Sequence, residues 1–304
     1  MFGMEVEVYL LEKAYDSIYL NENTDILDYI FENTDNRVYK DYYRYQLELR
    51  SKPHRHLKDC FSEIVELYNK VRNLLKDTNY FIVPCSYIPV SVVNEVAMFN
   101  GMHIHISDDN IDELIDRVYA LYPYLLIINR LFHSSPKSTI SSMRLLESQH
   151  IYRVTPLYYR DDITSQDRYF DISLNYHNEN SRHRLKDCTT IEIRLFDVPP
   201  FVIESLEFYE RVFKDFERNL IILDSNSSKD IINKITELDK IHVIDMIRKL
   251  SAYKIPIDSL KPLFMQIYSK YDIYYSIELE RALTYSLPMI TSKFYSTVIK
   301  SAMI

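Results

Sequence analysis

The sequence predicts an α+β protein in which helices lie outside a β-sheet whose other side is polar. Short segments with alternating polar and apolar residues occur along the chain between longer segments with apolar residues at helical spacing. With 304 residues, 47% of them hydrophobic and 26% charged, the chain can bury a sizeable core. These observations favour a packed globular protein over a disordered or fibrous one.

The elements of the N-terminal half follow from this periodicity. Residues Met4 to Leu11 alternate as a strand, and residues 37–51 form a second strand that ends near Ser51. Residues 55–76 form an amphipathic helix. Residues 80–93 are extended and broken by prolines, residues 102–106 alternate again, and a second long helix runs from Ile111 to about Leu131.

The rest of the chain changes character near residue 227. Extended segments at 143–157 and 168–176 precede a polar loop at 177–188, a strand at 189–196 and a helix at about 201–219. From residue 227 onward only helical patterns remain, so we expect a mixed domain over 1–226 and a helical C-terminal region over 227–304. We expect the helical region either to dock on the mixed domain or to mediate assembly. Formation of a homo-oligomer is therefore an open alternative.

Charge and composition exclude several classes of partner. A net charge of −8 without a Lys/Arg block argues against nucleic acid. No apolar run reaches the roughly 20 residues that cross a bilayer, and the acidic start is unlike a signal peptide. We therefore expect an intracellular, cytoplasmic protein without membrane contact. The 3 cysteines lack metal-site spacing, which indicates free thiols.

Glycine is the one outlier of composition, with only 2 in the chain. Gly3 precedes Glu5 and Glu7, and Gly101 precedes His103 and His105. The ordinary role of glycine is a turn with positive φ. We therefore expect turns that lead into these two strands.

Four segments place two ionisable residues on one face of a strand, because positions i and i+2 point to the same side. One of them alone is explained by a solvated strand face. Four in one chain favour a shared polar surface instead. The segments are Glu5-Val6-Glu7, Glu48-Leu49-Arg50, His103-Ile104-His105 and Glu192-Ile193-Arg194.

The residue types of these segments indicate metal-dependent phosphate chemistry. Carboxylates with an imidazole are ligands for Mg²⁺ or Mn²⁺ rather than for thiol-bound metals. Such ions neutralise phosphate oxygens, and arginine offers paired contacts to a phosphoryl group. Arg50 and Arg194 are the candidates for that second role.

A longer series of motifs resembles a known family. It comprises Gly3-Met4-Glu5-Val6-Glu7, Gln46-Leu47-Glu48 with Arg50-Ser51, Asn100-Gly101-Met102-His103-Ile104-His105, and Ile191-Glu192-Ile193-Arg194 with Asp197. In type and order it resembles the motifs of glutamate-cysteine ligases and the wider carboxylate-amine ligase and glutamine synthetase superfamily. The resemblance covers roughly residues 1–217, and its specificity lies in the combination.

The resemblance implies a curved antiparallel sheet that forms a funnel, with ATP at one end and Mg²⁺ ions at its waist. By position, Glu7 and Glu48 would bind one metal. Glu5, His103 and Glu192 would bind another. Asp41, seven residues before Glu48, matches a further metal carboxylate. This odd separation puts the two on opposite faces of a regular strand, so a bulge or bend is required.

The implied reaction joins a carboxylate substrate, with glutamate as the candidate, to an amine through an acyl phosphate. Arg194 would stabilise the transferring phosphoryl group, and no protein nucleophile is required. Two alternatives stay open. One is a phosphotransferase on the same fold, and the other is a non-catalytic binding or assembly protein.

Further candidates lie in polar loops and next to the motifs. Arg144, which follows Ser134-Ser135-Pro136, could bind a substrate carboxylate. Arg182 and Arg184 belong to a basic cluster that could grip phosphate. An ordinary polar loop explains Arg144 nearly as well, and a solvated charged loop is the favoured explanation of the basic cluster. His105 either orients a ligand or faces solvent.

Overall fold

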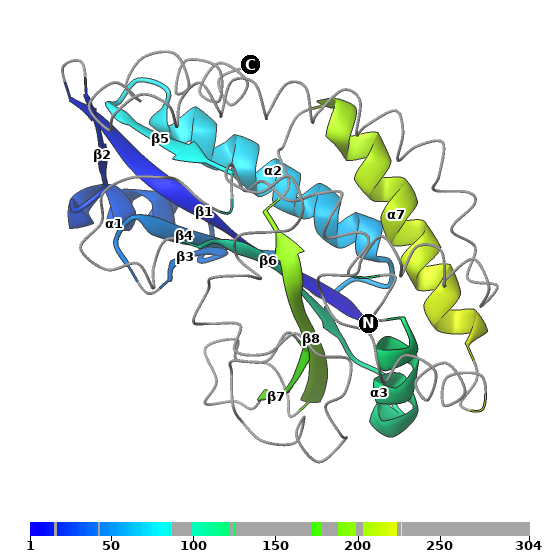
Figure 1. Ribbon diagram of the computed structural model, residues 1–304. Helices are drawn as coiled ribbons and strands as arrows, with labels where there is room; N and C mark the ends of the chain where they lie inside the picture. The colour runs from blue at the N-terminus through cyan, green and yellow to red at the C-terminus, as the bar shows by residue number, and fades with distance from the viewer. Residues whose placement is uncertain are drawn as a thin grey trace, which may run out of the picture.

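The computed structural model describes residues 1–14, 17–41, 43–84, 86, 99–121, 125, 172–177, 188–198, 203–223 and 226. Within these residues the chain forms one eight-stranded sheet with helices packed against it (Figure 1). The antiparallel sheet with outer helices that the sequence and its family resemblance predict is thereby confirmed. The predicted helical region 227–304 lies outside the described residues.

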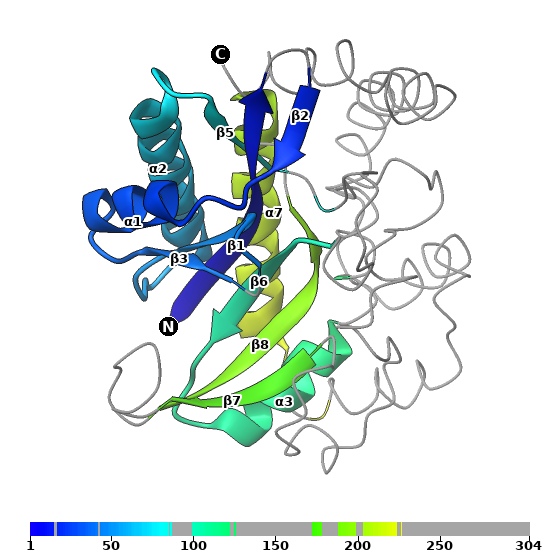
Figure 2. The same cartoon turned by 90° about the vertical axis from the view of Figure 1, so that its left-hand side faces the viewer.

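The sheet is built around one long strand, β1 (Phe2–Ala14). Its order is β3-β4-β1-β6-β8-β7, and every pairing described is antiparallel. The bounds of the others are β2 Ser17–Leu20, β3 Val38–Lys40, β4 Gln46–Arg50, β5 Tyr80–Val83, β6 Gly101–Ile106, β7 Ile172–His177 and β8 Cys188–Asp197. In Figure 2, β6, β8 and β7 follow one another as neighbours.

Strand β1 has partners along both edges. Residue Glu5 lies between Arg50 of β4 and His103 of β6, so those two strands flank the first half of β1. Residue Leu11 lies between Leu20 of β2 and Phe81 of β5, which flank the second half. The strand is therefore central throughout, which fixes the orientation of its side chains.

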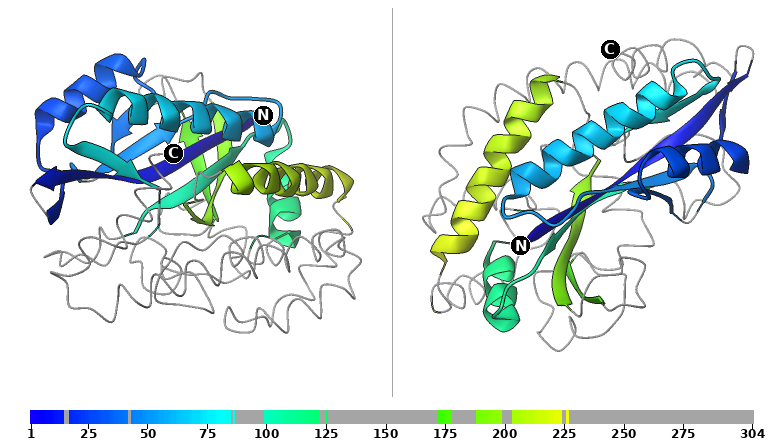
Figure 3. Two further views of the ribbon diagram at one scale, coloured as in Figure 1. Left: turned by 90° about the horizontal axis from the view of Figure 1, so that it is seen from above. Right: turned by 180° about the vertical axis from the view of Figure 1, so that it is seen from behind.

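Helices cover one face of this sheet. Helix α2 (Leu57–Leu75) packs across β1, β4 and β5, and α7 (Ile203–Ile222) lies beside α2 (Figures 1 and 3). Helix α1 (Thr24–Asn33) contacts β3, and α3 (Ile111–Ala120) contacts β8. None of the helices that the structure describes has an apolar stretch long enough to span a bilayer.

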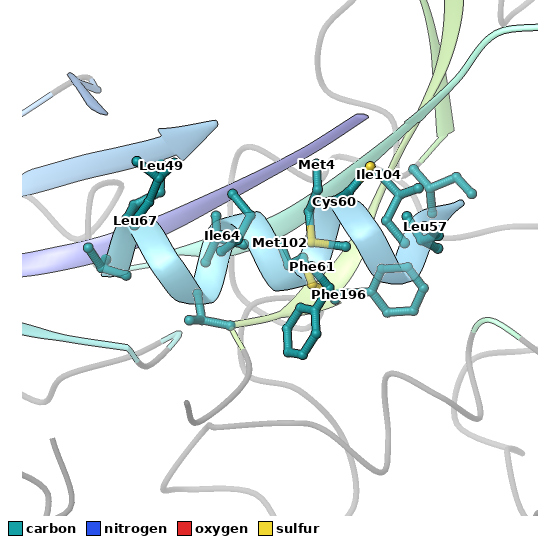
Figure 4. Close-up of a cluster of buried hydrophobic side chains, with 14 of the residues drawn as sticks. Met4, Leu49, Leu57, Cys60, Phe61, Ile64, Leu67, Met102, Ile104 and Phe196 are labelled. Atoms are coloured by element: carbon teal, nitrogen blue, oxygen red, sulfur yellow. The ribbon is translucent and has the colours of Figure 1, made fainter. Parts of the chain in front are cut away.

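The core lies between α2 and the sheet (Figure 4). Apolar residues of α2 recur at spacings of three and four, so they share the face that meets the sheet. Full burial of such a side chain contributes roughly 1.5–3 kcal/mol. The labelled residues of this cluster are Leu57, Cys60, Phe61, Ile64 and Leu67 of α2 with Met4, Leu49, Met102, Ile104 and Phe196 of the sheet.

Helix α7 also closes the N-terminus of α2. The residue before α2, His56, makes no side-chain cap. Instead Leu57 donates its backbone N–H to the Glu217 carboxylate of α7, and His56 Nδ1 lies 3.2 Å from the same carboxylate. The rings of Phe61 and Phe213 add an edge contact at 5.3 Å between the same two helices. A buried acid on one helix thus satisfies a free N–H of the other.

The structure corrects the second predicted strand. Residues 37–51 form two strands, β3 and β4, joined by a turn, and Asp41 donates its backbone N–H to the Gln46 carbonyl across that turn at 3.0 Å. Two further elements, β2 and α1, were not predicted from the sequence. Helix α1 has a local signal, because Asn23 caps it by accepting the Asp25 N–H at 2.9 Å.

The expectation for the glycines is wrong. Gly3 and Gly101 both lie inside strands, β1 and β6, and no described glycine has a positive φ. The chain uses Asp35 and Asn36 where it needs the left-handed region, with φ of 56° and 54°. Short polar side chains tolerate that conformation better than most.

Candidate active site

Register brings the predicted residues of β1, β4 and β6 together on the face away from α2. Since the even-numbered residues of β1 belong to the core, Glu5 and Glu7 point to the opposite side. Glu5 pairs with Arg50 and with His103, and Glu7 pairs with Glu48. Cross-strand neighbours have Cβ atoms about 4.5–5.5 Å apart. These five side chains therefore form one cluster.

A bulge in β8 changes which of its residues reach this face. Met102 and Ile104 of β6 are two residues apart, but their partners Phe196 and Ile193 are three apart. The extra residue in β8 shifts the alternation of that strand. Both apolar partners consequently remain in the core.

The bulge places two acids of β8 on the polar face. Glu192 pairs with His105 before the bulge, and Asp197 pairs with Gly101 after it. Their separation of five residues would put them on opposite faces of a regular strand. Asp197 is fully buried. Simple alternation could not have assigned it to this site.

His103 lies at the centre of the cluster, with 3% of its surface exposed. Its Nδ1 is 3.1 Å from Glu192 and 3.7 Å from Glu5, and its Nε2 is 3.8 Å from Glu7. Burial and the Arg194 charge lower the pKa of His103, but the three carboxylates outweigh them and raise it to about 9. The acids thus hold a positive charge at this point.

Glu5 bridges the two halves of the site. Its Oε1 is 3.5 Å from Arg50 Nε, and its Oε2 is 3.4 Å from His105 Nε2. Burial raises the pKa of Glu5, whereas His105, His103 and Arg50 together hold it well below its usual value. Glu192, which accepts from Arg194 Nη1 at 2.8 Å, also has a depressed pKa despite burial. Both carboxyls are therefore ionised.

Glu48 and Arg50 form a pair on β4. Arg50 Nε donates to Glu48 Oε1, and its guanidinium lies 4.2 Å over the Tyr39 ring. Burial and the charge of Glu5 raise the pKa of Glu48 to about 8 against the pull of Arg50. Arg50 Nη1 is buried and makes no hydrogen bond to the described residues. It is a donor available for a ligand.

Asp41 is also close to this pair. It is half-buried, and its charge contributes to the raised pKa of Glu48. The turn between β3 and β4 removes the need for a bulge, because Tyr39 pairs with Glu48 and Asp41 follows Tyr39 by two residues. Asp41 and Glu48 therefore lie on the same face of the sheet.

The donor set fits a hard divalent cation. Glu5, His105 and Glu192 each offer one ligand atom, and these atoms lie within 4.8 Å of one another. Two carboxylates and an imidazole suit Mg²⁺ or Mn²⁺. The family resemblance implied His103 for this group, and His105 was expected either to orient a ligand or to face solvent. The geometry brings both histidines to Glu5 and Glu192, with His105 Nδ1 3.4 Å from Thr190 Oγ1.

Other polar contacts complete the site. Glu7 Oε2 accepts the Gly101 N–H at 2.6 Å, and Gln46 Nε2 donates to Asn100 Oδ1 at 3.0 Å. Gln46 and Asn100 were not predicted as site residues, although both belong to the motifs that resemble the ligase family. The sequence signal that could have identified them is their position, because Gln46 lies two residues before Glu48 and Asn100 lies one residue before Gly101. Of the predicted site residues, Arg144, Arg182 and Arg184 lie outside the described residues.

A cavity of about 280 Å³ adjoins the cluster at the N-terminal end of β1. This volume is near the lower end of small-molecule sites, roughly 300–1,000 Å³. Three site residues, Glu5, Arg50 and His105, line it together with Tyr39, Ser51, Ser107 and Thr190. The half-buried Arg37 and the exposed Lys52 also line it, and these two residues are called its rim below.

Comparison with solved structures identifies proteins of similar architecture. A bifunctional glutathione synthetase from Pasteurella multocida matches with a TM-score of 0.57 and 15% identity over 99% of this chain and 51% of its own. A glutamate-cysteine ligase from Francisella tularensis, in complex with AMP, matches with a TM-score of 0.56 and 14% identity over 99% and 88%. The chain therefore has a fold similar to that of these two proteins.

A further structure supports this assignment of the fold. A glutamine synthase homolog matches with a TM-score of 0.51 and 12% identity over 99% of this chain and 70% of its own. The chain spans about half the length of the bifunctional glutathione synthetase. Comparison with protein-family models finds no match, and neither does comparison with curated protein sequences.

Proposed function

We propose that this protein is an ATP- and Mg²⁺-dependent carboxylate-amine ligase that forms an amide through an acyl phosphate. The observation that carries the proposal is the convergence of four buried or nearly buried glutamates, two histidines and two arginines on one face of a ligase-type sheet. Burying so many charges is unfavourable unless they are paired or bind an ion. A functional site explains why the fold retains them.

The residues divide into two roles. Glu5, His105 and Glu192 would hold one divalent ion, with His103 beside them. Glu7 and Glu48 would hold a second, with Asp41 close by. When bound, such ions offset the repulsion between a substrate carboxylate and the phosphates of ATP.

The arginines supply the remaining charge for phosphoryl transfer. Arg194 is fixed by its bond to Glu192, and Arg50 offers the buried N–H that its Glu48 pair leaves free. Donors aimed at the transferring group stabilise the charge that develops on its oxygens. Attack of the substrate carboxylate on the γ-phosphate gives an acyl phosphate and ADP, and the amine then displaces phosphate. The protein need not supply a nucleophile.

The cavity beside Glu5 and His105 is our proposed nucleotide site. Its rim carries Arg37 and Lys52, which suit a polyanion, and its lining includes Glu5 and His105 of the metal group. This arrangement would place the terminal phosphates at the acids and the remainder of the nucleotide in the cavity. The carboxylate substrate, for which glutamate is our first candidate, would approach from the side of Glu7.

The test is the release of phosphate from ATP by the purified protein. We expect release that requires Mg²⁺ or Mn²⁺ and depends on both a carboxylate and an amine. Formation of ADP without the amine and without free phosphate, with the phosphoryl group retained on a substrate, would indicate a phosphotransferase. Absence of ATP binding in either metal would refute both enzyme proposals and favour a non-catalytic protein.

An isotope experiment tests the intermediate. A carboxylate substrate labelled with ¹⁸O should transfer one labelled oxygen to the released phosphate, because the carboxylate oxygen attacks phosphorus. Mass spectrometry of the phosphate measures the transfer. Unlabelled phosphate formed in parallel with amide would contradict an acyl phosphate.

A further inference from the structure

One carboxylate outside the site ties together the rim of the cavity. Glu63 lies on α2, with 13% of its side chain exposed. Its Oε1 accepts from Arg37 Nη1, and its Oε2 accepts the Lys52 backbone N–H at 2.7 Å and lies 2.8 Å from His54 Nε2. Two other chain segments, one with Arg37 and one with Lys52 and His54, therefore meet α2 at Glu63.

Both of these segments border the cavity directly. Arg37 immediately precedes β3, and its carbonyl accepts the Arg50 N–H at 2.9 Å. Lys52 follows β4, and His54 continues that segment by exchanging backbone bonds of 2.8 Å with Phe2. The position of the rim therefore depends on how α2 holds these residues.

Glu63 is suited to this role because it is ionised. Burial raises the pKa of Glu63, but the bonds from His54 and Lys52 and the charge of Arg37 bring it below its ordinary value. A charged acceptor forms stronger hydrogen bonds than a neutral one. Because the pair with Glu63 already restricts the long Arg37 side chain, less side-chain conformational entropy is lost when a ligand binds to it.

We propose that Arg37 contacts the polyphosphate of the nucleotide in this cavity, and that Glu63 is a positioning residue that aims Arg37 and holds the rim. The proposal rests on the proposed function. A guanidinium has five N–H donors, and the pair with Glu63 uses the Nη1 end, so further donors remain for phosphate oxygens. The Arg37 side chain is 25% exposed and lines the cavity, which a ligand can therefore reach.

The test measures binding of the β,γ-imido analogue of ATP with Mg²⁺ by calorimetry on the full chain. Arg37→Ala should weaken binding about tenfold or more, as for loss of a hydrogen bond to a charged group. Arg37→Lys should recover part of this loss. Glu63→Gln should weaken binding about three- to tenfold. Glu66→Gln, on the exposed side of α2 one turn away, is the matched control and should bind like the wild type.

A double variant separates positioning from general damage to the fold. If Glu63 acts through Arg37, Glu63→Gln should have little further effect once Arg37 is alanine. Fully additive losses would overturn the positioning role. Binding by Arg37→Ala equal to wild type would overturn the contact while leaving the ligase proposal intact. Failure of the wild type to bind would instead overturn the ligase proposal, and this one with it. If Glu63→Gln does not fold, the two Arg37 variants decide the contact.

Discussion

Replacing Glu192 with Gln removes one charge from the metal group while keeping the size of the side chain. In the structure, Glu192 Oε1 lies 3.1 Å from His103 Nδ1 and 2.8 Å from Arg194 Nη1, and the carboxylate is one of the three proposed ligand groups. An amide can still offer its oxygen to a cation, but it carries no charge to balance one. The variant therefore isolates the electrostatic part of metal binding.

The expected loss follows from the position of Glu192. Removing a residue that only supports a metal ligand lowers metal affinity about 10- to 100-fold. Glu192 is a proposed direct ligand, so we expect a loss of about 100-fold or more, equivalent to about 2.7 kcal/mol at 1.36 kcal/mol per factor of ten. Arg194 also loses its charged partner, so turnover should fall as well.

Titration with Mn²⁺ followed by electron paramagnetic resonance measures the affinity directly. The exposed Glu66→Gln is the matched control, since it makes the same chemical change on α2. Thermal unfolding without added metal checks that each variant folds. Equal Mn²⁺ affinity in wild type and Glu192→Gln would refute the assignment of β8 to the metal site.

Three further predictions concern stability and reactivity. Glu217→Gln should lower the free energy of unfolding by roughly 1–2 kcal/mol, because the charged acceptor of the Leu57 N–H is lost, and an unchanged denaturation midpoint would contradict this. The pKa of His103 is about 9 in the folded chain and 6.5 for the free side chain. Between pH 6.5 and pH 9 the folded protein without metal therefore binds more protons at His103 than the unfolded chain does. Its stability should fall as pH rises from 6.5 to 9, and the thermal shift caused by Mg²⁺ should grow over the same range, because the ion must displace that proton. A shift that stays constant would count against His103 as part of the site. Burial raises the pKa of Cys60 to about 11, so mass spectrometry should find it unalkylated by iodoacetamide at pH 8 until the protein unfolds.

Local periodicity was sufficient to predict the polar face of the central strands. In β1, the alternation of Glu5, Val6 and Glu7 directly determines which side chains enter the core, because the strand has partners on both edges. The same rule of alternation predicted that His103 and Glu48 lie on the polar face. The spacing of the apolar residues in α2 predicted in the same way which face of this helix is buried.

Features that depend on pairing between distant segments could not be read from the sequence. The bulge that brings Asp197 to the site arises from the register of β8 against β6, not from any local pattern. The turn before Gln46 likewise moves Asp41 to the face of Glu48, and its residues resemble a continuous strand. The role of Glu63 depends on α2 lying beside the cavity rim, a contact between residues far apart in the chain.

Anomalous diffraction from crystals grown with Mn²⁺ and ADP is the most direct test of the metal-dependent nucleotide site. We expect a Mn²⁺ peak bound by Glu5, Glu192 and at least one of the two histidines, at roughly 2.0–2.6 Å from its oxygen ligands. We also expect nucleotide density in the cavity next to Arg50. Nucleotide bound elsewhere on the molecule, with no Mn²⁺ peak between Glu5 and Glu192, would contradict the proposed site.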